Sequence, residues 1–299
     1  MRKLAALLLL AACREPVEIA PPRPPAFPQL ARFEPMRVPP GNPLTREKVA
    51  LGRKLFADPR LSADGTTACT GCHEPKYGYT IGAAGNRACP SLINAGYAKG
   101  YYWENAPIPL EQAIAGVIKF IVVPQGEGRP TVDEVFAKLN DDPALRKEFV
   151  AAFGAEASQE NVIQALASYV RTLVPANAPW VRFHDGDANA LSEQARRGYE
   201  VFDRKARCTN CHSGVLLSDR LVHDVGTKGP KKTPTLLNIA RSAPYFHDNR
   251  TASLDEAVDR MLAGGYPTEQ PDPQLKAVTL TPEERELLLA FLRELDADV

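Results

Sequence analysis

The sequence predicts an all-α fold whose helices are joined by many loops. Apolar residues recur at helical spacing after Ser158 and again in residues 281–295. Thr131, Ser253 and Thr281 each precede an apolar run and have a Glu three residues later, the pattern of a capping box at a helix start. No segment alternates apolar and polar residues convincingly enough to predict a strand, and 27 prolines and 20 glycines imply many turns.

The composition is that of a globular protein with room for two domains. The chain has 299 residues, of which 44% are apolar and 24% are charged. Its formal net charge is zero, and no basic stripe is interleaved with aromatic residues. We therefore expect no nucleic-acid partner.

The first 12 residues have the pattern of a signal peptide. Arg2 and Lys3 precede an apolar run that is too short to span a bilayer. The run ends in the sequence LAAC, which resembles a bacterial lipobox, so we expect Cys13 to be lipidated and to anchor the protein on the periplasmic face of a membrane. An ordinary signal peptide with a chance cysteine is the alternative. Residues 13–40 are rich in proline and predict an extended tether.

An internal repeat divides the rest of the chain into two domains, 41–177 and 178–299. Each contains one Cys-x-x-Cys-His motif, at residues 69–73 and 208–212. Downstream of the motifs, residues 90–117 align without a gap with residues 234–261, and both segments enter a helix at the same offset. The sequence therefore predicts a duplicated module.

The repeated motif predicts two covalently attached c-type haems. The thiols of Cys69 and Cys72, and of Cys208 and Cys211, can each add to the two vinyl groups of one haem, and the His that follows can bind its iron. A single zinc held by four cysteines is an alternative, but zinc ribbons bring their Cys pairs closer in sequence and need no following His. A disulfide within each pair is disfavoured because Cys residues three apart seldom have the required geometry. His73 and His212 are then the proximal iron ligands.

The repeat is unequal on the opposite side of the two haems. Met261 lies seven residues after Leu254 in the second module, and the equivalent position of the first module is Val117, which cannot bind iron. A Met ligand raises the reduction potential of a haem and suits electron transfer, whereas an open face leaves room for a small oxidant. The alternative is that Met261 is one more apolar residue of a core-facing stripe.

Four segments together resemble the bacterial di-haem cytochrome c peroxidase and MauG superfamily. They read NPLTREKVALGRKLFADPRLSADGTTACTGCH, PSLINAGYAKGYYWENAPIPLEQA, CTNCHSG and TPTLLNIARSAPYFHDNRTASLDEAVDRM, and the resemblance covers roughly residues 40–299. It implies two cytochrome c-like helical domains that face each other across a cleft, with a peroxidatic haem in the first and an electron-receiving haem in the second. It also implies that Met261 is the second ligand of the second haem, where MauG-type enzymes have Tyr, and that Trp103 lies between the haems as an electron relay or as an interface aromatic.

The chain departs from the family pattern around the first haem. The loop 79–85 lacks the His that blocks the site in classical members, so we expect the first haem to be open without activation. The resemblance places the family's distal Gln on Gln112, but the acidic residue expected after it is out of register. Val122 or Gln125 occupies that region, and Glu127 is the nearest carboxylate that could move a proton during peroxide cleavage, unless it is a solvated loop residue.

Further family positions carry weaker expectations. The resemblance places on Ala88 an Asn that helps to hold an inter-haem calcium, so this position disfavours calcium, which is left open. Cys89 is expected to be a small buried residue, and His223 and His247 are expected near the second haem, as propionate partners or as structural residues. His184 is expected on the surface.

We therefore expect a di-haem peroxidase that reduces hydrogen peroxide with electrons from a small cytochrome c or cupredoxin. Two alternatives are a MauG-like oxidase that acts on a protein partner and an electron carrier without peroxide chemistry. A homodimer is left open.

Overall fold

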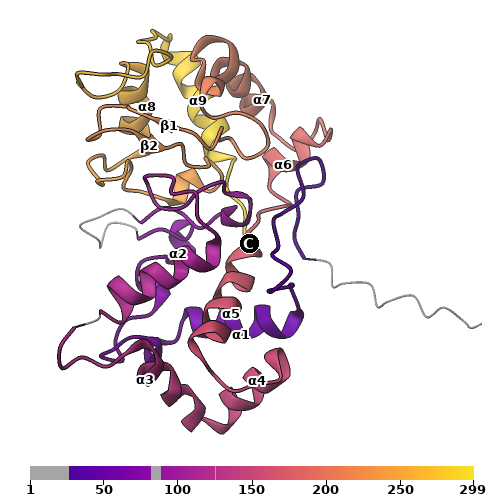
Figure 1. The fold of residues 1–299 in the computed structure, drawn as a ribbon. Helices are drawn as coiled ribbons and strands as arrows, with labels where there is room; N and C mark the ends of the chain where they lie inside the picture. The colour runs from indigo at the N-terminus through magenta and orange to yellow at the C-terminus, as the bar shows by residue number, and fades with distance from the viewer. Residues whose placement is uncertain (1–26, 82–88, 125) are drawn as a thin grey trace, which may run out of the picture.

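The computed structural model describes residues 27–81, 89–124 and 126–299. In Figure 1 the described chain forms two mostly helical halves, the first below in indigo to dark pink and the second above in orange to yellow. The predicted helical character is confirmed.

The described residues of the first half form five α-helices, most of which begin at a side-chain cap. Thr45 and Ser158 each accept a hydrogen bond from a backbone N–H of the first turn, and Thr131 forms the predicted capping box with Glu134. The helices are α1 (Arg46–Phe56), α2 (Leu110–Val117), α3 (Val132–Ala137), α4 (Pro143–Phe153) and α5 (Gln159–Arg171). A single π-helical turn, Ile118–Val122, continues α2.

The second half contains four α-helices and one short sheet. Ser253 and Thr281 cap helices α8 and α9 as predicted, and Thr281 forms a full capping box with Glu284. The helices are α6 (Pro179–His184), α7 (Glu193–Glu200), α8 (Leu254–Leu262) and α9 (Pro282–Arg293). The strands β1 (Val222–His223) and β2 (Lys231–Lys232) pair antiparallel and were not predicted, because two residues are too few to show alternation.

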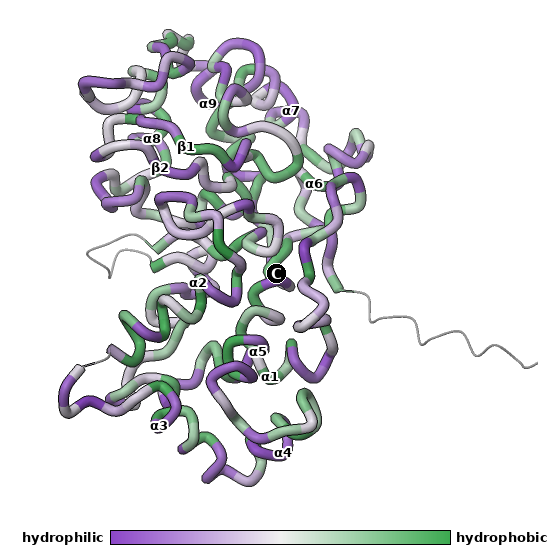
Figure 2. Tube along the Cα trace, viewed as in Figure 1, coloured by the Kyte–Doolittle hydropathy of each residue, from purple (hydrophilic) through white to green (hydrophobic). Residues whose placement is uncertain are grey.

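Each half is organised around one close helix crossing. A Cβ atom built on Gly52 of α1 would lie 2.0 Å from the carbonyl oxygen of Ala165 in α5, and one built on Gly198 of α7 would lie 2.0 Å from that of Leu287 in α9. Only glycine allows these backbones to approach so closely. Figure 2 shows apolar stretches in green along the interior helices and hydrophilic stretches in purple on many outer loops.

The predicted duplication is visible in individual backbone contacts. Asn94 and Asn238 both have positive φ, and each backbone N–H bonds a carbonyl just beyond the last helix of its half, Leu173 at 2.8 Å and Leu295 at 3.1 Å. Likewise, the hydroxyl of Tyr101 donates to the carbonyl oxygen of Ala95 at 3.2 Å. The hydroxyl of the equivalent Tyr245 donates to that of Ile239 at 3.1 Å. The two modules therefore share one backbone design.

Part of the predicted tether packs on the folded chain. Leu30 is buried and its N–H donates to the hydroxyl of Tyr97, and Arg220 lies over the ring of Phe33. Figure 1 shows this segment beside α6, where Arg32 approaches Gly186. The later part of the predicted tether, 13–40, therefore has apolar residues that contact the folded chain, and the tether itself stays a prediction. Cys13 lies outside the described residues, within which no helix is long and apolar enough to cross a membrane.

Candidate haem sites

The two Cys-x-x-Cys-His motifs form the same tight turn. The carbonyl oxygen of Cys69 accepts hydrogen bonds from the backbone N–H groups of Cys72 (3.1 Å) and His73 (2.9 Å). The carbonyl oxygen of Cys208 accepts the equivalent bonds from Cys211 (3.2 Å) and His212 (2.8 Å). Each turn thus brings two thiols and one imidazole together.

Both motif imidazoles are oriented to bind a metal through Nε2. Nδ1 of His73 donates to the carbonyl oxygen of Tyr79 at 3.0 Å, and Nδ1 of His212 donates to that of Leu217 at 3.0 Å. Burial lowers the pKa of both side chains, so both are neutral at pH 7. A neutral imidazole whose Nδ1–H is already bonded presents the lone pair of Nε2, as metal-binding histidines do.

The second motif opens into a cavity of about 290 Å³ that fits a covalently held haem. Cys208, Cys211 and His212 line it together with Met261 of α8. Burial raises the pKa of the Cys208 thiol to about 12 and that of the Cys211 thiol to about 11, so both thiols are protonated before any attachment. The rest of the wall is mainly apolar and includes Phe202, Leu236, Leu254, Val258, Leu262 and Leu288. Two thiols, one free imidazole nitrogen and an apolar wall are the donor set that haem c requires.

The thiols of the first motif have a third thiol beside them. A hydrogen bond with Cys89 lowers the pKa of Cys72 to about 6, although burial opposes it, whereas burial raises that of Cys69 to about 12. Cys89 is partly buried rather than fully buried, and it also lines the cavity of the second half. The spacing of Cys89 from the motif gave no sign of this contact.

Helix α8 shows which face of α2 corresponds to the cavity. Leu254, Ala257, Val258, Met261 and Leu262 of α8 all line the cavity of the second half. In the gap-free repeat, the equivalent positions in the first half are Leu110, Ala113, Ile114, Val117 and Ile118. This face is entirely apolar, so α2 itself offers neither a ligand nor an acid–base group there.

Gln112 and Glu127 do not join this face. Gln112 corresponds to Glu256, which does not line the second-half cavity, and it lies instead on the wall of a separate cavity of about 600 Å³ with Lys119 and Asp133. Glu127 is exposed on a turn and lines neither cavity. Gln112 lies one residue before Ala113, which belongs to the cavity-equivalent face. On a helix this places its side chain on a different face from that of Val117. Their catalytic roles stay predictions, and the backbone geometry does not favour them. Ala88 and Gln125 lie outside the described residues.

Trp103 belongs to the first half but lines the cavity of the second. Its ring packs edge to face on that of His247, with centroids 6.2 Å apart, and the two residues occupy equivalent positions of the repeat. The carbonyl oxygen of Trp103 accepts a hydrogen bond from the backbone N–H of Lys232 at 2.8 Å. Trp103 therefore lies where the two halves meet.

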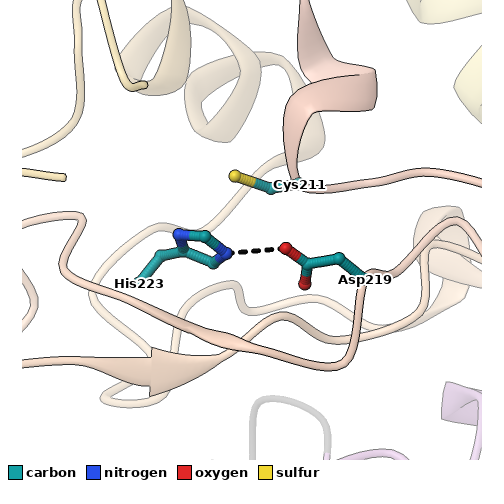
Figure 3. Close-up of side chains that lie close together, drawn as sticks. All are labelled: Cys211, Asp219 and His223. Carbon is teal, nitrogen blue, oxygen red and sulfur yellow. Dashed lines mark hydrogen bonds and ion pairs between the residues drawn. The ribbon is translucent and has the colours of Figure 1, made fainter. Parts of the chain in front are cut away.

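His223 lies in a buried ion cluster at the edge of the same cavity. Its Nδ1 donates to Asp272 at 2.6 Å and its Nε2 donates to Asp219 at 2.7 Å. Burial alone would lower the pKa of His223, but the bonds to Asp272 and Asp219 and their charges together raise it. Figure 3 shows Cys211 close to His223 and Asp219, a grouping that could hold a metal ion. Because both imidazole nitrogens already bond carboxylates and Cys211 belongs to the haem motif, we interpret it as an ion cluster.

The sequence did not identify several residues of this region. Asp272 lies far from His223 along the chain, and Lys232 precedes the aligned segment 234–261, so neither pattern nor repetition pointed to them. His184 is exposed, as expected, and packs on Trp180.

Comparisons with known proteins agree with the geometry. A family model described as di-haem cytochrome c peroxidase matches residues 46–189. The chain is 33% identical over 290 residues to the methylamine utilization protein MauG of Methylorubrum extorquens, covering 87% of this chain and 81% of that protein. It is 31% identical over 330 residues to the cytochrome-c peroxidase IdrP1 of Pseudomonas sp. strain SCT, covering 90% of this chain and 86% of that one. Among solved structures, a MauG-like protein associated with microbial copper homeostasis superposes with a TM-score of 0.78 at 27% identity, covering 88% of this chain and 93% of that chain.

Proposed function

Because the chain belongs to the di-haem cytochrome c peroxidase family, we propose that it reduces hydrogen peroxide to water with electrons from a small protein donor. Each turnover consumes one peroxide, two electrons and two protons and yields two waters. The main observation behind this proposal is that the second half has Met261, which can bind iron, where the first half has Val117, which cannot. Met261 lines the same cavity as His212.

Two haems c are the proposed cofactors, one in each cytochrome c-like half. Cys69 and Cys72 would attach the first, Cys208 and Cys211 the second, and the free Nε2 atoms of the two motif histidines would bind the irons. Bound haem supplies the redox-active iron at which the oxygen–oxygen bond is cleaved.

The protein makes the two sites unequal. The thioether of Met261 would complete the coordination of the second haem, which favours electron transfer. Val117 and its apolar neighbours on α2 leave the first site without a second protein ligand from this helix, so a small oxidant can approach. Trp103, which lies at the junction and lines the second cavity, is the proposed relay for electrons that pass between the halves.

A small cytochrome c or cupredoxin is the proposed donor. The pattern of residues 1–13 supports export and a lipid anchor on Cys13, which would place the enzyme on the periplasmic face of a bacterial membrane, where such donors occur.

A second candidate is a MauG-like oxidase that withdraws electrons from a protein partner. Two observations favour it: the similarity to proteins named MauG or MauG-like, and the absence of acid–base side chains on the cavity-equivalent face of α2. The Met at position 261, where MauG-type enzymes have Tyr, favours the peroxidase.

Absorption and electron paramagnetic resonance spectra of the ferric protein test the proposal. We expect one high-spin haem and one low-spin His/Met haem, followed by turnover of peroxide when a reduced cytochrome c is supplied. Two low-spin haems without turnover would leave only an electron carrier. Oxidation of a protein partner without turnover of the cytochrome would favour the MauG-like candidate.

A further inference from the structure

Lys232 joins the two halves beside the cavity that contains His212. It lies on β2 of the second half, and its backbone N–H donates to the carbonyl oxygen of Trp103 at 2.8 Å in the first half. Its Nζ donates to the carbonyl oxygen of Gly100 at 3.1 Å, also in the first half. Lys232 also lines the cavity. Because both its backbone N–H and its Nζ bond the first half, its ammonium group is fixed at the junction of the halves.

No carboxylate of the described residues balances the charge of Lys232. Within residues 27–81, 89–124 and 126–299, no carboxylate lies within ion-pair distance of its Nζ, whereas the neighbouring Lys231 pairs with Glu104 at 3.6 Å. Burial lowers the pKa of Lys232 to about 8, so the side chain is still mostly charged at pH 7. A half-buried ammonium group that donates to a backbone carbonyl implies a further, anionic partner, because an uncompensated charge away from water is costly.

His247 offers a second unused polar atom to the same cavity. Its Nδ1 is buried and has no hydrogen-bond partner among the described residues. Its ring is fixed edge to face against Trp103, and burial lowers its pKa, so it is neutral and can donate one hydrogen bond. Buried imidazole nitrogens are rarely left unpaired, which again indicates a missing partner.

We propose that Lys232 and His247 bind a propionate carboxylate of the haem attached to Cys208 and Cys211. This rests on the proposed function only in that a haem occupies the cavity. Haem carries two carboxylates, and at the junction of the halves the cavity wall supplies the Lys232 cation and the neutral donor of His247. Arg207, Lys231 and Lys276 also line the cavity. Because Lys232 also bonds Gly100 and Trp103, the carboxylate would tie the second haem to the first half at the proposed relay. Both are positioning residues rather than catalytic ones.

Resonance Raman spectra and redox titration of the holoprotein test this site without relying on turnover. We expect Lys232→Met to shift the propionate bending band of one haem and to lower the midpoint potential of the second haem, because a nearby cation disfavours the oxidised iron. Lys232→Arg should restore the potential towards that of the wild type. Lys228→Met is the matched control: this lysine is exposed in the same loop and does not line the cavity, so band and potential should not change.

A second variant covers the case in which Lys232→Met does not retain haem. His247→Phe keeps a ring against Trp103 but removes Nδ1, and it should shift the same band. The inference is overturned if the wild type binds two haems while both the Lys232 and His247 variants leave band and potential unchanged. A wild type that attaches no haem at Cys208 and Cys211 would instead refute the proposed function.

Discussion

The two halves of this chain use one scaffold for two purposes. In both, a glycine, on α1 or on α7, allows close contact with the last helix of that half, and an Asn with positive φ bonds a carbonyl beyond that last helix. In both, the motif His donates its Nδ1–H to a carbonyl in the loop that follows. These scaffold contacts are shared, and on the cavity face of the helix the two halves differ in chemistry at Met261 against Val117.

Two of the aligned pairs that differ include residues of the second cavity. Val117 is aligned with Met261, the proposed ligand, and Trp103 is aligned with His247, which it contacts. Function in this fold therefore separates into a duplicated frame and a small set of asymmetric side chains.

Exchange of the ligand position should have the largest effect. Val117→Met would supply a thioether where the first half has none, and we expect peroxidase activity to fall roughly 100-fold, about 2.7 kcal/mol of activation free energy. The ferric spectrum should change from mixed-spin to low-spin. Val117→Leu, which adds volume but no ligand, is the control. Full activity in Val117→Met would mean that Val117 does not face the open side of the haem.

If the two helix crossings are equivalent, substitution of the glycine at either one should lower the stability of the protein by a similar amount. A Cβ at either Gly52 or Gly198 would lie 2.0 Å from a backbone oxygen of the partner helix. Gly52→Ala and Gly198→Ala should each lower the free energy of unfolding by about 2 kcal/mol, despite the better helix propensity of Ala. Denaturant titration measures this. A loss of stability in only one of the two variants would mean that the two helix crossings are not packed equivalently.

The sequence was informative where structure is encoded locally or repeated. Capping boxes at Thr131 and Thr281 located helix starts, because their hydrogen bonds involve residues three apart. The gap-free alignment of 90–117 with 234–261 predicted equivalent helix starts at Leu110 and Leu254, which the structure confirms.

What the sequence missed depends on contacts between distant segments. The partner of His223 at Asp272 and the contact of Lys232 with Gly100 join residues that no periodicity connects. Similarly, Leu30, which contacts Tyr97, belongs to a proline-rich stretch whose composition predicts a tether, so the sequence did not indicate this contact. The family resemblance alone assigned the distal Gln to Gln112. An error of one residue in such an alignment is enough to place a helical side chain on another face.

The ion cluster around His223 is a feature of the second half alone, since His73 is the single histidine of residues 41–177. The pKa of His223 is raised, so its contribution to stability is present below its unfolded value of about 6.5 and is lost as pH rises through the folded value. The pKa values of Asp219 and Asp272 are lowered, so their contribution is present above about 4 and is lost as pH falls through the folded values.

Asp272→Asn should therefore destabilise the protein by about 2 kcal/mol near pH 6, and the difference from wild type should shrink as pH rises through the pKa of His223. Unfolding free energies at several pH values measure this. Glu283→Gln, which removes an exposed pair with Arg197, should cost less than about 0.5 kcal/mol at every pH. A pH-independent loss in Asp272→Asn would show that the carboxylate acts through packing rather than charge.

The smallest effect is expected at Glu127, where family resemblance and geometry disagree. This residue is exposed on the turn that follows α2 and the π-helical turn, outside both cavities, so Glu127→Gln should change kcat by less than about twofold. A general acid–base group is worth roughly 100-fold or more, so steady-state kinetics with peroxide separates the two cases clearly. A fall of that size would mean that the loop after α2 closes over the first site during turnover. It would then be this loop, rather than the helix face, that gives the first half its chemistry.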